Sequence, residues 1–245
     1  MKYIAFGLIL ICCLARAIET NGYHISTKHV TLEKLVERVK NVLKTGNEQL
    51  GIPVLDPFFA EQTQFKLKQK EINLHVLLTN VNVSGLSEFK VLDGDIHLIP
   101  TDLKFNINLT WPLIIGSTNY KTSSPSYIDA YSFYGDSDIN LSAQNFTLET
   151  EITFTVSEEH LKVKNMELKL SLKKLDFHIR DLQVAYNYEV AIFPDLLSEL
   201  ISEIAPEWLE DETFINNLKL FAIKKIDAFL SIKTAAEILE FLETI

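Results

Sequence analysis

Cysteine is almost absent from this 245-residue chain, and the two that occur, Cys12 and Cys13, lie within a predicted N-terminal leader. Beyond that leader the sequence excludes disulfides, thiol chemistry and cysteine-ligated metals. The fold must therefore be stabilised by its core alone. A hydrophobic content of 47% permits a substantial core, and 10% aromatic residues are typical of a globular protein rather than a disordered one.

Glycine motifs and positive charge are also scarce. The eight glycines form neither a phosphate-binding loop nor a nucleophile elbow, and no His-Glu-x-x-His metal motif occurs. We therefore predict no enzyme activity, no cofactor and no metal site. The net charge of −10 without any basic run makes nucleic acid and anionic membrane surfaces poor partners.

The N-terminus has the three parts of a secretory signal peptide. Met1-Lys2 is a short positive start, Ile4 to Leu14 is apolar, and Ala15-Arg16-Ala17 is a small-x-small cleavage site. The apolar run is too short to span a bilayer comfortably. We predict a signal peptide over residues 1–17, secretion to the extracellular space without a membrane anchor, and a single domain over residues 18–245.

Apolar and polar residues alternate over more than half of the chain, from about Phe65 to Ile192. Leu103, Phe105 and Ile107 begin one such series, with polar residues between them. A period of two predicts strands with one apolar and one polar face. A change of phase predicts a bulge or turn near Gln69 to Glu71. The candidate strands that follow it are Glu88–Val91, Ile96–Leu98, Leu103–Ile115, Asp138–Leu141, Phe146–Val156, Leu161–Leu172, Leu175–Ile179 and Leu182–Ile192. Their length and close succession favour antiparallel meander pairing.

Helical periodicity occurs only near the two ends. Thr27 to Lys44 carries apolar residues at spacings of three and four, which predicts an amphipathic helix. A second helix is predicted to begin at Pro194 and to end at Pro206. Phe214 to Leu230 gives a longer stripe, and Ile238 to Leu242 a short final one. These helices must cover the apolar face of the sheet.

Four sequons for N-glycosylation begin at Asn82, Asn108, Asn140 and Asn145. The first three of these asparagines lie between apolar neighbours, so the strand period assigns them to the polar face, where a glycan could project. We predict glycosylation at some of them. Unused sequons are the alternative, because the tripeptide is common by chance.

Several segments resemble those of the insect takeout and juvenile-hormone-binding proteins and of the group 7 mite allergens. They are Leu55-Asp56-Pro57, the run from Asn80 to Phe89, Gly116 to Tyr120, Pro194-Asp195-Leu196-Leu197 and Pro206-Glu207-Trp208-Leu209. The resemblance covers essentially the whole chain after the leader. Takeout relatives carry a cysteine pair near the mature N-terminus, and its absence here favours the allergen-like insect branch.

The resemblance implies an α+β super-roll, in which a strongly curved antiparallel sheet wraps around a long C-terminal helix, with an additional N-terminal helix. It also implies a hydrophobic cavity, as in the tubular lipid-binding superfamily. The residues that we expect to line such a cavity are Phe105, Ile107, Trp111, Phe154, Phe177, Phe221 and Phe229. For each of them ordinary dry core is the alternative.

These expectations favour a secreted, non-enzymatic protein that carries or senses a small hydrophobic, lipid-like ligand. The alternative is a secreted interaction protein that recognises a protein or a microbial surface component without lipid cargo. Such a protein would need a contiguous apolar patch outside the sheet interior. A secreted hydrolase would need converging polar groups, and the sequence offers no such constellation.

Overall fold

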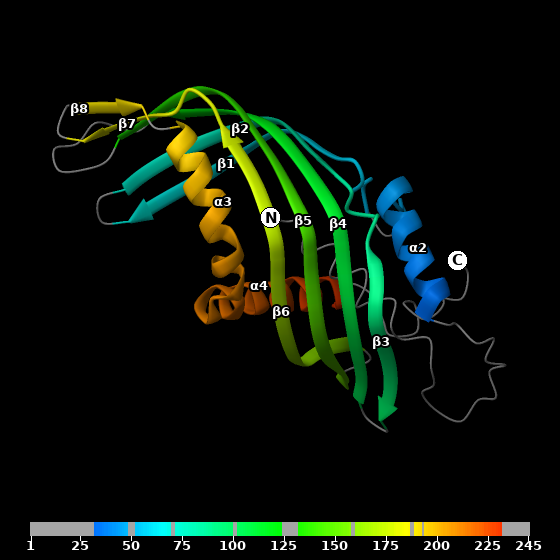
Figure 1. The fold of residues 1–245 in the computed structure, drawn as a ribbon. Coiled ribbons are helices and arrows are strands. Elements are labelled where there is room, and N and C mark those ends of the chain that lie inside the picture. Colours follow the sequence, from blue (N-terminus) through cyan, green and yellow to red (C-terminus); the bar gives the residue numbers. More distant parts are fainter. Residues whose placement is uncertain are drawn as a thin grey trace.

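A computed structural model describes residues 32–48, 52–69, 72–99, 102–123, 132–157, 160–186, 189–192 and 194–231. These residues form an eight-stranded antiparallel sheet bent into an arch, with helices on its concave side and one further helix beside its edge (Figure 1). The predicted α+β class and the curved antiparallel sheet are confirmed.

The strands are β1 Phe58–Gln69, β2 Ile72–Ser84, β3 Lys90–Ile99, β4 Asp102–Ser123, β5 Ser132–Ser157, β6 His160–Ile179, β7 Gln183–Tyr186 and β8 Glu189–Ile192. The helices are α2 Leu32–Thr45, α3 Pro194–Glu210 and α4 Glu212–Leu230. Helix α2 confirms the predicted N-terminal helix over residues 32–44. The predicted residues 27–31 and the final stripe at 238–242 lie outside the described residues.

Strand β4 joins two halves of the sheet. One of its edges pairs with β3 along residues 102–110 and with β2 along residues 115–122. Its other edge pairs with β5 over its whole length, and β5 pairs in turn with β6. Neighbouring strands mostly pair as a meander predicts. In the part of the sheet that the structure describes there are two exceptions, since β2 pairs with β4 instead of β3, and β7 pairs with β5 instead of β6.

A crease crosses the long strands between the two halves, at Pro112, Asn145 and Lys173. The ladder pairs Trp111 with Phe146 and Leu113 with Gln144, and the row between these pairs is skipped. Asn145 has a φ of 50°, which lies in the left-handed region. The strands continue through this row, so the sheet bends here without ending.

The buried face changes phase at the crease. On β6 the even-numbered Leu168, Leu170 and Leu172 are buried, whereas after Lys173 the odd-numbered Leu175 and Phe177 are partly buried and the even-numbered Lys174 and His178 are exposed. Strands β4 and β5 change phase at the same row. We call the part with β3 and residues 102–111, 146–157 and 160–172 the core half. The part with β1, β2, β7, β8 and residues 113–123, 132–144 and 174–179 is the distal half.

The crease corrects the predicted strand boundaries. The segments Asp138–Leu141 and Phe146–Val156 belong to the single strand β5, and Leu161–Leu172 and Leu175–Ile179 to the single strand β6. A break in the apolar period can mark the end of a strand, or a point within one strand where the inward-facing residues change between even and odd numbers. Here the second case applies, so the break marks the crease.

The C-terminal helical region also differs from expectation. Helix α3 continues through Pro206 to Glu210, so its predicted end was wrong. Packing of α3 along β6 outweighs the backbone hydrogen bond that a proline removes. Helix α4 contains the predicted longer stripe from Phe214 to Leu230. It meets α3 at Asp211, whose carboxylate accepts a 2.8 Å hydrogen bond from the backbone N–H of Phe214 and so caps α4.

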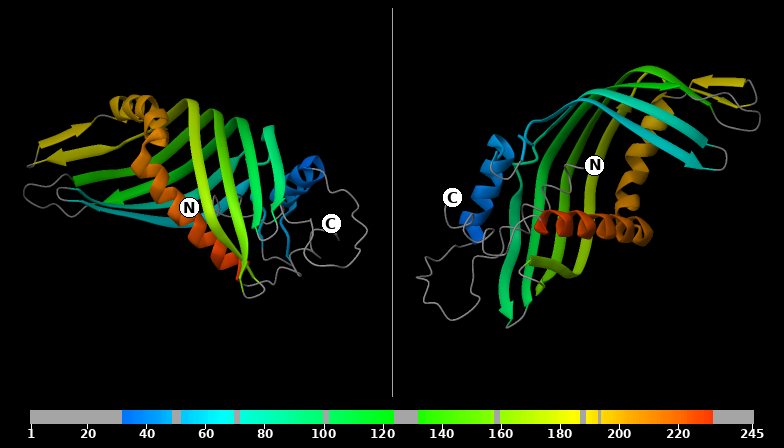
Figure 2. Two further views of the ribbon diagram at one scale, coloured as in Figure 1. Left: turned by 90° about the horizontal axis from the view of Figure 1, so that it is seen from below. Right: turned by 180° about the vertical axis from the view of Figure 1, so that it is seen from behind.

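Helix α4 crosses the concave side of the core half, and α3 lies along β6 (Figure 2). Apolar residues of α2, α4 and the three long strands form one buried cluster. Its members from α4 are Ala222, Ile226 and Leu230. Each large aliphatic side chain buried here contributes about 1.5–3 kcal/mol, so the core half supplies most of the stability. No helix within the described ranges is long and apolar enough to span a bilayer.

Candidate functional site

The concave face of the core half is filled. Phe105, Ile107 and Phe154, three of the residues expected at a cavity, have exposed fractions of 0%, 3% and 1%. A side chain with so little accessible surface contacts other protein atoms on all sides. These three residues therefore have no surface to offer to a ligand in this structure.

The concave face of the distal half is apolar but only partly buried. Val83 of β2, Gly116 of β4, Leu141 of β5 and Phe177 of β6 are direct neighbours along one row of the sheet. Their side chains share a face because they are cross-strand pairs. Val83, Leu141 and Phe177 retain accessible surface. We call the row and its partly buried neighbours the distal apolar surface, which comprises Val83, Gly116, Ile139, Leu141, Leu175 and Phe177.

Glycine at position 116 gives this surface its shape. A Cβ atom there would lie 3.0 Å from the Cγ of Leu141, closer than ordinary van der Waals contact. The Leu141 side chain thus lies across the Gly116 backbone. A larger residue at position 116 would force Leu141 to move.

Helix α3 borders the distal apolar surface at the free edge of β6. The hydroxyls of Ser198 and Ser202 accept hydrogen bonds of 3.1 and 3.0 Å from the backbone N–H groups of Ile179 and Phe177. Asp227 of α4 does the same for Val163, at 2.8 Å. Both helices therefore bind the strand edge through polar side chains as well as through apolar packing.

A network of contacts holds the crease in place. The carboxylate of Asp56 accepts hydrogen bonds from the backbone N–H groups of Gly85 and Ser87, at 2.9 and 2.7 Å, and from the Ser87 hydroxyl. Trp111 donates from its indole nitrogen to the carbonyl oxygen of Leu86, at 2.8 Å. The link between β2 and β3 is thereby fixed against the start of β1 and the middle of β4.

The predicted cavity residues do not gather at one place. Trp111 lies at the crease, where its ring centroid is 5.5 Å from that of Phe89 and 5.6 Å from that of Phe146. Phe177 lies on the distal apolar surface. Phe221 is partly buried against the core, with the Nζ of Lys225 5.6 Å from its ring centroid. Phe229 belongs to α4, and its side chain lies outside the described residues.

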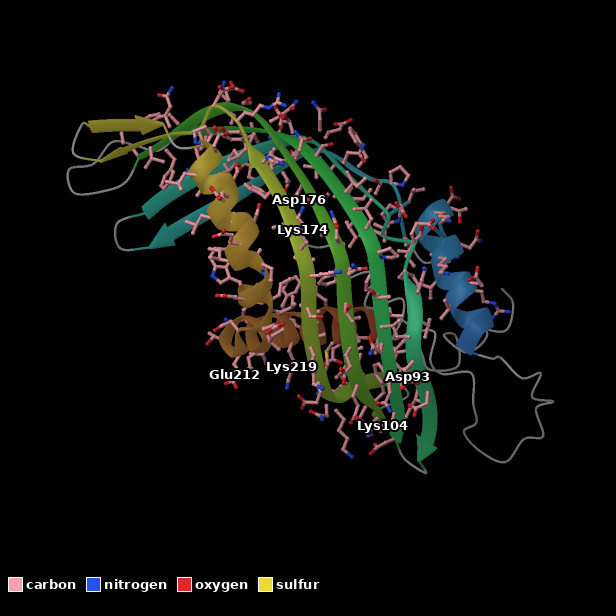
Figure 3. All side chains as sticks on the ribbon, viewed as in Figure 1. Asp93, Lys104, Lys174, Asp176, Glu212 and Lys219 are labelled. Atoms are coloured by element: carbon pink, nitrogen blue, oxygen red, sulfur yellow. The ribbon has the colours of Figure 1, made fainter. Side chains whose placement is uncertain are left out.

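Sequence reasoning missed Val83, Leu141 and their neighbours because they follow a break in the apolar period. That break was itself the available signal. If the break is interpreted as a switch between even and odd inward-facing residues within one strand, Leu175 and Phe177 are assigned to the concave side. The alternating Lys174 and Asp176, which Figure 3 labels, are then assigned to the convex side.

Polar groups within the distal half are engaged in structural contacts. Tyr120 is buried, and its hydroxyl donates to the carbonyl oxygen of Arg180. Burial, with a smaller contribution from the nearby carboxylate of Asp181, raises the pKa of Tyr120 to about 12.

Across the described residues, no three side chains of His, Cys, Asp or Glu lie close enough to hold a metal ion.

The four sequon asparagines differ in exposure. Asn82 and Asn140 are exposed and lie in one row of the distal half, separated by Ser117. Asn145 is exposed at the crease. Asn108 is only partly exposed, and its Oδ1 is buried without a hydrogen-bond partner.

Together these features define an α+β protein with a curved antiparallel sheet, one filled half and one half with an accessible apolar concave face. The chain belongs to the haemolymph juvenile hormone binding protein family, whose model matches residues 12–210. The preference for the allergen-like branch stays a prediction. A search of curated proteins gave no match.

Two solved structures show a low similarity to this one. Takeout 1 from Epiphyas postvittana is 16% identical over 83% of this chain and 93% of its own, with a TM-score of 0.48. A lipopolysaccharide binding protein is 13% identical over 87% of this chain and 40% of its own, with a TM-score of 0.30. Similarities at this level carry no functional argument.

Proposed function

We propose that this protein is secreted after cleavage of residues 1–17, and that its single domain binds a small hydrophobic, lipid-like ligand without enzymatic chemistry. The observation that carries the proposal is the contrast between the two halves of the sheet. The core half buries Phe105, Ile107 and Phe154 almost completely, whereas the distal apolar surface keeps accessible Val83, Leu141 and Phe177 side chains. Membership of a family named for hormone binding supports the same function.

The affinity of such binding depends on how much of the ligand tail is buried. Burying a methylene contributes about 0.8 kcal/mol, so a tail of a dozen carbons gains on the order of 10 kcal/mol before ordering costs. Micromolar affinity requires about 8 kcal/mol. Because ordering costs are subtracted from this gain, micromolar binding needs nearly complete burial of the tail, and a partly covered tail should bind more weakly.

The test compares two leucines on opposite faces of the distal half. Leu141→Gln places an amide on the distal apolar surface, and Leu113→Gln places the same amide on the opposite face, beside Gln144 and Lys174. Binding of a fluorescent fatty acid and of a neutral fluorescent isoprenoid is measured by titration, and native mass spectrometry detects lipid that co-purifies.

We expect Leu141→Gln to weaken binding of at least one probe about tenfold, which corresponds to 1.4 kcal/mol. Leu113→Gln should bind as the wild type does. Thermal unfolding of both variants checks that the fold is retained. Equal affinities for the two variants, or no probe uptake and no co-purifying lipid with the wild type, would refute the proposal.

A second function, recognition of a protein partner, is favoured by the free side of α3. Leu196 and Leu200 have exposed fractions of 61% and 48%. They lie about 200° around the helix from Ser198 and Ser202, which bind β6. Trp208 is also exposed, and the acidic neighbours of this stripe are Glu199, Glu203 and Glu207.

An exposed apolar stripe beside carboxylates, on a helix without any basic residue, is complementary to a cationic amphipathic helix. Such a partner is tested with a lysine–leucine helical peptide and a glutamate–leucine peptide of the same pattern. This function requires that only the lysine peptide binds, that salt weakens binding, and that Leu200→Gln abolishes it while Leu141→Gln leaves it unchanged. Equal binding of both peptides would exclude it.

A further inference from the structure

The convex face of the distal half carries an unbroken row of exposed residues, Phe59, Asn82, Ser117, Asn140 and His178. It runs beside the row of the distal apolar surface but on the opposite face of the sheet, because adjacent residues of a strand point to opposite sides. Two of the five residues begin sequons. Both asparagines are therefore accessible to a glycan in the folded protein.

We propose that Asn82, Asn140 and Asn145 carry N-linked glycans, that Asn108 does not, and that the convex side of the distal half is consequently shielded by carbohydrate. The proposal rests on the proposed secretion, because the modification occurs in the secretory pathway. It leaves the concave side free for the ligand.

The reaction needs a lipid-linked oligosaccharide diphosphate as the donor. The side-chain Nδ2 of the asparagine attacks the anomeric carbon of the first sugar and forms the new carbon–nitrogen bond. The bond between that carbon and the diphosphate oxygen breaks, the lipid diphosphate leaves, and the amide nitrogen loses one proton. Transfer precedes folding, so a chain that receives a glycan which the fold cannot accommodate fails to fold, and the secreted molecules lack that glycan.

The folded structure can accommodate glycans at both Asn82 and Asn140. Two strand spacings separate them, about 10 Å, across the small side chain of Ser117. The Nδ2 of Asn140 donates to the Asp138 carboxylate at 2.6 Å. A glycosylated amide keeps one N–H, so this hydrogen bond can persist and orient the sugar away from the sheet.

The folded structure can also accommodate a glycan at Asn145, for a different reason. Its left-handed backbone at the crease takes it out of the regular ladder, and its side chain is exposed. A glycan there would project at the bend of the arch. It would displace no cross-strand neighbour, since the row through Pro112 and Lys173 is already skipped.

The folded structure does not accommodate a glycan at Asn108. This asparagine pairs with Asp93 of β3, directly beside a register shift between Val91 and Asp93, and with Glu149 of β5. The Oδ1 of Asn108 has no accessible surface, and the same holds for the Oδ1 of its neighbour Asn106, whose Nδ2 donates to Asp95 at 2.6 Å. A glycan at Asn108 would have to turn the amide so that its buried Oδ1 leaves the position that it occupies in the fold.

The experiment maps occupancy directly. The full chain is expressed with its own leader in insect cells, purified from the medium, and treated with a peptide N-glycosidase in heavy-oxygen water, which converts each occupied asparagine to a labelled aspartate. Peptide mass spectrometry should find the label at Asn82, Asn140 and Asn145 and not at Asn108. Label at Asn108 comparable to the others, or the absence of label from any of the three, overturns the proposal.

Matched variants remove one sequon each and keep its asparagine. Ser84→Ala, Ser142→Ala and Thr147→Ala should each lower the mass of the secreted protein by one glycan, whereas Thr110→Ala, which removes the Asn108 sequon, should not. If the protein remains in the cells, the leader assignment fails separately. The chain is then expressed behind an established secretion leader, and the same occupancy pattern decides the glycan proposal.

Discussion

The carboxylate of Asp56 and the backbone N–H of Ser87, 31 residues apart in sequence, are joined by a 2.7 Å hydrogen bond at the crease. The other carboxylate oxygen of Asp56 accepts from Gly85 at 2.9 Å. Gly85 has a φ of 90°, and a Cβ there would lie only 2.4 Å from the carbonyl oxygen of Leu113. The Asp56 side chain therefore fixes the link between β2 and β3, at the point where the partner of β4 changes from β2 to β3.

Replacing Asp56 by alanine should cost about 2–3 kcal/mol of unfolding free energy, because two backbone N–H groups lose a charged acceptor in a half-buried site. Urea unfolding measures this cost. The control is Glu61→Ala, an exposed carboxylate on the same strand region, which should change stability by less than about 0.5 kcal/mol. Similar effects of the two variants would contradict the role of Asp56 at the crease.

Asn145 should tolerate glycine and reject valine. A φ of 50° costs a β-branched residue about 1–2 kcal/mol, and glycine adopts it freely. Unfolding of bacterially produced protein, which carries no glycan, isolates this effect. Asn119→Val, at an exposed position of β4 without a positive φ, serves as the control and should be close to neutral. If Asn145→Val were as stable as Asn145→Gly, the crease would not depend on the left-handed residue.

Tyr120 should make stability fall at alkaline pH. Its pKa of about 12 in the folded state exceeds the ordinary value of 10.0, so the folded protein holds this proton more tightly than the unfolded chain. The resulting stability is fully present below about pH 10 and is lost as the pH rises toward about 12.

Tyr120→Phe provides the comparison. At neutral pH the variant should be about 1 kcal/mol less stable, because the carbonyl oxygen of Arg180 loses its hydrogen-bond donor. Above pH 10 this difference should shrink, since only the wild type has this group to titrate. A constant difference between pH 8 and the alkaline limit of folding, followed by urea unfolding, would argue against a buried protonated phenol.

Ser198 and Ser202 should control the protection of β6. The double variant Ser198→Ala/Ser202→Ala leaves the N–H groups of Ile179 and Phe177 without acceptors, at about 1–3 kcal/mol each. Hydrogen exchange at these two amides should accelerate, while exchange at Val163, which is bonded to Asp227, should change less. Ser171→Ala, at an exposed position of β6, is the control.

Much of the fold could be predicted from the alternation of residues. The series that contains Leu103, Phe105 and Ile107 did predict a buried face, and the N-terminal stripe predicted α2. The crease could not be predicted, because a period break gives the same pattern for a strand that ends and for one that changes face. Only the ladder, which pairs Trp111 with Phe146 and Leu113 with Gln144, distinguishes the two.

The candidate site was less predictable for a related reason. Large aromatic residues such as Phe105 and Phe154 were expected to line a cavity, but their exposure depends on how α4 covers the sheet. The position of α4 is set by tertiary packing of Ile226 and Leu230 and by the cap at Asp211. Sequence periodicity identifies which side chains face inward, whereas it contains no information about which part of the inner face the helices leave accessible.

The polar attachment of α3 and α4 to β6 has a consequence for self-association. Strand β6 has 20 residues and pairs with β5 on one side only, so its other edge would be a template for strands of further copies. Ser198, Ser202 and Asp227 occupy donors of that edge. Truncation before Pro194 would uncover it, and the shortened chain should form β-rich aggregates at concentrations where the intact chain stays dispersed.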